Sequence, residues 1–242
     1  MKLSPNQFIL SVVISILFLS CQFLEDFEKG NGNIISRDHK LNHFSRIRIG
    51  GNFDVFLSKS DETSLRIITD ENLHEFIELD VQGNTLSITQ YRKLISKNKI
   101  RIIINYTDLE ELRLTGAAMI QNEGFIEEKE LNLRMDGAGM IDVKIRTEFL
   151  KVILSGAGVM KIAGQTERQE LNLSGAGGVK AFNLDSKYCK VTVSGIGGAE
   201  IYVTEELDAK IEGVGGIEYE GNPGNVRTEI NGIGKIKPVE EN

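Results

Sequence analysis

The stretch LNLSGAGGV, residues 171–179, is one of seven variants of a single phrase in this chain. Between Glu111 and Lys237 the variants read LRLTGAAMI, LRMDGAGMI, VILSGAGVM, LNLSGAGGV, VTVSGIGGA, AKIEGVGGI and TEINGIGKI. Their first glycines are Gly116, Gly137, Gly156, Gly175, Gly195, Gly213 and Gly232, at successive spacings of 21, 19, 19, 20, 18 and 19 residues. A period near 19 residues indicates stacked coils of one unit whose connecting turns vary in length.

Apolar and polar residues alternate within each phrase, and this period of two indicates strands. The column two residues before the first glycine is apolar throughout: Leu114, Met135, Leu154, Leu173, Val193, Ile211 and Ile230. The columns four before and four after it are mostly apolar as well. Each coil is therefore predicted to hold two short strands that meet at a Gly-x-Gly bend, where glycine permits a positive φ or close backbone approach. Stacking at about 4.8 Å would close a common core that no single coil could form.

Residues 35–108, ahead of the repeats, also contain strand patterns but lack this period. Gly83-Asn84 predicts a hairpin turn between IELDV and LSITQ. The section either begins the solenoid with irregular coils or forms a β cap on it, since an open strand edge invites pairing with other chains. The chain thus divides into an N-terminal irregular β section at 35–108 and a glycine-repeat β-solenoid at 109–242.

The start of the chain indicates export. Residues 8–20 read FILSVVISILFLS, an uncharged run that fits the apolar core of a secretory signal, usually ~7–15 residues, and is too short for a spanning helix of about 20. The following LFLSC motif, residues 17–21, resembles the lipobox of bacterial lipoproteins. This resemblance implies a signal peptide at 1–20 and a lipid on Cys21, and the polar residues 21–34 then read as a tether. An ordinary secretory signal with an incidental cysteine, or a membrane-anchored start, is the alternative.

The charge balance argues against two classes of partner. Removal of residues 1–20 removes Lys2 and takes the formal net charge from −7 to −8. Nucleic acids and anionic membrane surfaces select basic patches, so neither is expected as a partner. Once Cys21 is lipidated, Cys189 has no cysteine left to pair with, and we expect it to act as a small buried hydrophobe.

Three sets of residues resemble one family. They are the opening Ile47-x-Ile49-x-Gly51-x-Phe53-x-Val55, the central Gly83-Asn84-x-Leu86-x-Ile88, and the serial Ser-Gly-Ala-Gly and Ser-Gly-Ile-Gly phrases. From about Phe44 to Ile236 the chain is similar to the head GIN domain of putative auto-transporter adhesins, found in exported proteins of Bacteroidota. The resemblance implies an all-β, right-handed, single-stranded β-helix-like solenoid. One departure is Tyr106-Thr107-Asp108-Leu109, where a proline is expected before the leucine.

No residue pattern predicts a cofactor, a metal site or catalysis. The Gly-x-Gly phrases lack the full spacing of phosphate-binding loops and precede no helical pattern, so no nucleotide is expected. His39, His43 and His74 have no nearby cysteine and are expected in exposed loops. Ser155, Ser174 and Ser194 belong to a polar column before the bend and are expected to cap turns rather than to act as nucleophiles.

The sequence therefore predicts a non-catalytic binding or structural module, lipid-anchored in the cell envelope, with a glycan or an envelope protein as its partner. The alternative is a carbohydrate-active β-helix enzyme, a polysaccharide lyase or hydrolase, which would need converging carboxylates. The outward columns mix charge signs instead, with Lys180 expected beside Glu200 on the next coil.

Phe182 and Tyr202 are the candidate partner contact. Each lies seven residues after a repeat glycine, one beyond an inward position, so both side chains are expected to point outward on successive coils. Exposed aromatic side chains are a common footprint of protein or glycan contact. The competing interpretation is that neighbouring loops cover both rings and bury them beside the core.

Overall fold

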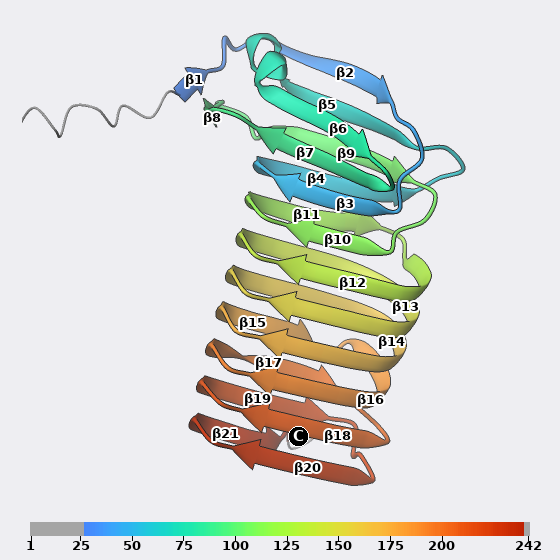
Figure 1. Cartoon of the computed structure of the whole chain (residues 1–242), viewed down its shortest axis with the longest axis vertical. Coiled ribbons are helices and arrows are strands. Elements are labelled where there is room, and N and C mark those ends of the chain that lie inside the picture. Colours follow the sequence, from blue (N-terminus) through green and yellow to red (C-terminus); the bar gives the residue numbers. More distant parts are fainter. Residues whose placement is uncertain (1–26, 240–242) are drawn as a thin grey trace, which may run out of the picture.

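The computed structural model describes residues 27–239, which form a β-solenoid of stacked coils (Figure 1). Its N-terminal strands are β1 (Phe27–Lys29), β2 (Ile34–Lys40), β3 (Arg46–Gly50), β4 (Asn52–Lys59), β5 (Ser64–Asp70), β6 (Ile77–Gln82), β7 (Thr85–Gln90), β8 (Lys93–Ile95) and β9 (Arg101–Tyr106), with a 3-10 helix at Glu71–Phe76. The repeat strands are β10 (Glu111–Leu114), β11 (Ala117–Glu123), β12 (Ile126–Met135), β13 (Ala138–Leu154), β14 (Ala157–Leu173), β15 (Ala176–Ala181), β16 (Leu184–Val193), β17 (Ile196–Tyr202), β18 (Glu206–Ile211), β19 (Val214–Glu220), β20 (Asn225–Ile230) and β21 (Ile233–Pro238).

The repeats form two parallel sheets that meet at the glycine bends. One sheet runs from β10 through β12, β13, β14, β16 and β18 to β20, and the other from β11 through β13, β14, β15, β17 and β19 to β21. The pairing is in register, so that Gly158 lies opposite Gly139 and Gly177. The bends are bonded to each other as well, because the Ala157 N–H donates to the Gly137 carbonyl oxygen over 2.9 Å. The predicted solenoid with coils of about 19 residues is confirmed.

The core is built from the predicted inward columns. Leu114, Met135, Leu154, Leu173, Val193 and Ile211 are all buried, as are the residues four before and four after each repeat glycine in these coils. The last coil differs: Ile230, in the same column, is 46% exposed because none of the described strands covers it. The alternating pattern therefore predicts which side chains face inward, but burial also requires a coil on each side.

The N-terminal section both continues the solenoid and caps it. β3 and β4 form a coil that pairs in parallel with β10 and β11, and on its other side they pair in parallel with β7 and β9. Antiparallel strands then close this end, with β6 on β7, β5 on β9 and β2 on β5. The predicted turn at Gly83 joins β6 to β7, with φ of 57°. The spatial order of the coils is thus not the order of the chain (Figure 1).

The structure adds a strand contact to the predicted tether and corrects the prediction for the histidines. Residues 27–29, within the predicted tether, pair in parallel with β8, and the Gly30 N–H donates to the Ile95 carbonyl oxygen over 2.9 Å. The expectation of exposed loop histidines was wrong for two of the three. His39 is half-buried in β2, and His74 is 6% exposed in the 3-10 helix and has a pKa lowered by burial. The predicted signal peptide and Cys21 lie outside the described residues.

Candidate functional site

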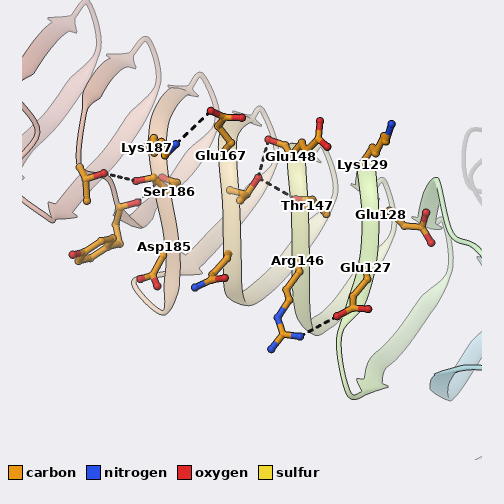
Figure 2. Close-up of a pocket in the computed structure, with 14 residues that line it drawn as sticks. Glu127, Glu128, Lys129, Arg146, Thr147, Glu148, Glu167, Asp185, Ser186 and Lys187 are labelled. Atoms are coloured by element: carbon orange, nitrogen blue, oxygen red, sulfur yellow. Dashed lines mark hydrogen bonds and ion pairs between the residues drawn. The ribbon is translucent and has the colours of Figure 1, made fainter.

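The bend opposite the glycines carries a surface groove of about 920 Å³ (Figure 2). It crosses successive coils, and its lining is polar and charged: Glu127, Glu128, Lys129, Arg146, Thr147, Glu148, Gln165, Thr166, Glu167, Asp185, Ser186, Lys187, Tyr202 and Thr204. We refer to these residues as the bend groove. Its position follows from β12, β13, β14 and β16, which carry the chain from one sheet into the other at this bend.

The in-register pairing places one side chain per coil in each column of the bend groove. One column is charged or amide-bearing and runs from Glu127 to Arg146, Gln165 and Asp185. The adjacent column bears a carboxylate and then hydroxyls: Glu128, Thr147, Thr166 and Ser186. Hydrogen-bonding groups therefore recur along the groove at the coil spacing of about 4.8 Å.

Cations neutralise several of the groove carboxylates. Arg146 Nη1 lies 2.9 Å from Glu127 Oε1, and Lys187 Nζ lies 3.5 Å from Glu167 Oε1 (Figure 2). The guanidinium of Arg146 also stacks 3.8 Å above the ring of Phe125. These pairs are exposed, so each contributes only about 0–1 kcal/mol to stability. As a result, the groove surface carries charges of both signs.

Polar side chains also form the floor of the groove. The Thr147 hydroxyl donates to the Thr166 hydroxyl over 3.0 Å, and the Ser186 hydroxyl donates to the Tyr202 carbonyl oxygen over 2.7 Å. Below them Gln169, fully buried, donates from Nε2 to the Ser186 hydroxyl oxygen over 2.7 Å. Gln169 occupies a column otherwise filled by Leu131, Leu150, Cys189 and Leu207. Its Oε1 has no hydrogen-bond partner among the described residues.

We expect Gln169→Leu to raise the free energy of unfolding by about 1 kcal/mol, because it removes a buried acceptor that lacks a donor. The Ser186 hydroxyl keeps its bond to the Tyr202 carbonyl oxygen in this variant. Thermal melting measures the effect, with the exposed Gln165→Leu as the control that should leave stability almost unchanged. A loss of more than about 1 kcal/mol would mean that the amide bonds of Gln169 outweigh its unpaired oxygen.

The two aromatic residues proposed from sequence take different positions. Tyr202 ends β17 and lines the bend groove, whereas Phe182 lies in the turn between β15 and β16 and does not line it. The β15–β17 ladder ends at the pair Ala181–Ile201, so Phe182 leaves the column before Tyr202 is reached. Both side chains are half-buried. Their role as a partner contact stays a prediction.

The structure also shows the positions of the predicted ion pair and of the remaining cysteine. Lys180 and Glu200 form the expected cross-coil ion pair at 3.6 Å. Cys189 is buried, and burial raises the pKa of its thiol, which keeps it protonated and unreactive. Within residues 27–239 no group of three or more histidine, cysteine, aspartate and glutamate side chains could hold a metal ion. Across that same range, no helix is long and apolar enough to span a membrane.

Sequence reasoning missed the bend groove. Its two columns lie ten and nine residues before the repeat glycines Gly137, Gly156, Gly175 and Gly195, so the glycine register aligns them, but their mixed residue types form no motif that marks a site. A second signal is the break in an apolar column at Gln169, which falls two residues before the phrase at 171–179.

Known proteins share both the sequence pattern and the fold. The family model described as "Putative auto-transporter adhesin, head GIN domain" matches residues 43–223. A putative adhesin of Bacteroides fragilis is 26% identical, with a TM-score of 0.84 over 88% of this chain and 100% of that one. A protein of Parabacteroides distasonis described as a putative lipid binding protein is 25% identical, with a TM-score of 0.70 over 89% of this chain and 100% of that one. No curated protein is detectably similar in sequence.

Proposed function

The chain belongs to the head GIN domain family of putative auto-transporter adhesins, and from this premise we propose that it is a lipid-anchored, non-catalytic binding module of the cell envelope. Membership of an adhesin-like family supports an exported or cell-surface location. The lipobox-like LFLSC at residues 17–21 supports an anchor on Cys21. The solenoid then stands on the membrane as a rigid module that presents its bends to partners.

The bend groove is the proposed binding surface, and the observation that supports it is its repetition. Each coil adds one charged or amide side chain and one hydroxyl or carboxylate at a constant step. A polymer with repeating polar units can satisfy such a ladder along its whole length, whereas a compact small molecule would use only part of it. We propose an extended envelope glycan as the ligand, with Tyr202 supplying an aromatic surface at one end of the groove.

The experiment is a glycan binding screen on the full chain, followed by the double variant Arg146→Ala with Asp185→Asn. This variant removes one charge of each sign from the groove and should weaken binding at least about tenfold, the equivalent of about 1.4 kcal/mol. Its matched control is Lys180→Ala with Glu200→Gln, which also removes one charge of each sign, outside the groove, and should leave binding unchanged. Equal loss in both variants, or none in the first, would refute the groove as the site.

The enzyme alternative would require a different arrangement of the groove carboxylates. Glycoside hydrolysis uses two carboxyl groups that flank one bond, whereas three of the five groove carboxylates, Glu127, Glu128 and Glu167, are each paired with a cation. This pairing favours binding over cleavage. The screen separates the two functions, because release of new reducing or unsaturated ends from a bound glycan would establish an enzyme.

A further inference from the structure

The solenoid ends, at the pole opposite β1, in a strand with an open edge (Figure 1). β20 pairs in parallel with β18, and none of the described strands lies on its other side. The Asn225 and Asn231 N–H groups donate to carbonyl oxygens of the preceding coil, over 3.1 and 2.8 Å. Because backbone groups point alternately to the two sides of a strand, the N–H and C=O groups of Val226, Thr228 and Ile230 point to the open side. Unpaired groups of this kind are a template for adding another strand.

The open edge also exposes apolar surface. Val226 and Ile230 continue inward columns of the core, yet each is 46% exposed. The other strand of the last coil, β21, is less suited to pairing, because Pro238 has no N–H and because Lys235 and Lys237 place like charges on it. Proline and lysine are common means of protecting an edge strand. Of the two strands of the last coil, β20 is therefore the one whose edge remains open to a partner.

We propose that β20 pairs with β20 of a second copy of this chain, antiparallel about a twofold axis at Thr228. This register sets Val226 opposite Ile230, Arg227 opposite Glu229, and Thr228 opposite itself. A twofold interface must be self-complementary, and this strand is: apolar meets apolar and cation meets anion. The inference is independent of the bend groove, because neither Arg227 nor Glu229 lines it.

The backbone geometry fits the same register. The residues whose N–H and C=O groups face the open side are Val226, Thr228 and Ile230, and they would form the hydrogen-bonded pairs of the antiparallel ladder. Arg227 and Glu229 would then form the non-hydrogen-bonded pairs, in which side chains lie closest and opposite charges stabilise the ladder. Val226 and Ile230 would join the cores of the two copies.

The charges on β20 are available for this contact. Glu229 Oε1 lies 3.2 Å from Lys210 Nζ and accepts a hydrogen bond from Asn231 Nδ2 on its own chain, but the carboxylate is exposed and can accept a second cation. Arg227 is exposed and forms no ion pair with any of the described residues. Pairing across the twofold axis would give it a carboxylate partner.

A charge-reversal and mixing experiment tests the proposal on the full chain in density-matched detergent, by sedimentation equilibrium. The wild-type protein should dimerise. Arg227→Glu alone and Glu229→Arg alone each place like charges opposite each other twice per dimer, and each should weaken dimerisation at least about tenfold. An equimolar mixture of the two variants should dimerise again, because both opposed pairs in the mixed dimer join a cation to an anion. Glu200→Lys, which reverses a charge on the sheet of β21 and outside the interface, should dimerise like the wild type.

The mixing step keeps the test independent of folding, since restored association shows that both variants are folded. A wild-type protein that stays monomeric overturns the proposal. So do single variants that dimerise like the wild type, because the contact then lies elsewhere. Variants that fail to associate when mixed exclude the antiparallel register about Thr228.

Discussion

Gly177→Ala should lower the free energy of unfolding by at least about 3 kcal/mol, because two separate costs coincide at this bend. Gly177 has φ of 143°, a conformation that side chains rarely adopt. A Cβ there would also overlap the carbonyl oxygen of Gly158 on the preceding coil. That oxygen belongs to backbone held in register by the ladder, so it cannot rotate away as a flexible side chain could. Relief requires whole coils to separate, which would disrupt the strand pairing on both sides.

Gly216→Ala is the matched control. Gly177 lies two residues after the repeat glycine Gly175, and Gly216 lies three residues after the repeat glycine Gly213. A Cβ on Gly216 would meet only the Lys235 carbonyl oxygen, at 3.8 Å, and the residue has no positive φ. We expect a change in stability within about 0.5 kcal/mol. Thermal and denaturant melts of the two variants measure the contrast. Similar melting temperatures for Gly177→Ala and the wild type would contradict the bend geometry.

Cys21→Ser should abolish incorporation of labelled fatty acid and release the protein from the membrane fraction. Each buried methylene group of an acyl chain contributes about 0.8 kcal/mol to membrane binding, so loss of the lipid removes the whole anchor. Fractionation of cells, followed by detection of the label, measures both effects. A labelled or membrane-bound Cys21→Ser protein would show that the anchor lies elsewhere.

The matched control for this substitution is Cys189→Ala. Cys189 is buried in the core, so its removal should leave both the label and the membrane fraction unchanged. The ordinary secretory signal makes the opposite prediction, since the wild-type protein and both variants would then be released from the membrane without any label.

The sequence by itself determines the coil. Alternation around each repeat glycine predicts the inward column from Leu114 to Ile211, and all six of these residues are buried. It also predicts the pairing of Lys180 with Glu200, because a constant period places equivalent residues side by side. These are local properties repeated many times, so each repeat reinforces the inference from the others. The glycines add the bends, since other residues do not fit where coils approach so closely.

The order in which the coils stack is decided only in the tertiary structure. β3 and β4 lie between the coil of β7 and β9 and the coil of β10 and β11, although β5 to β9 follow them in the chain. Alternation assigns each of these strands an inward face but not a neighbour. The ladder hydrogen bonds that select the neighbour join residues far apart in sequence, and every parallel strand offers the same backbone groups.

The bend groove and the open tip depend on the same long-range pairing. Arg146 and Asp185 each lie ten residues before a repeat glycine, Gly156 and Gly195, so the sequence assigns them to one column, but only the in-register stacking of coils makes that column part of a groove. Ile230 has the same apolar pattern as the buried Ile211, and it is exposed because no further coil covers it in the described structure. Sequence determines which side chains a coil turns inward; only the stacking of complete coils decides which of them are buried and which line a groove.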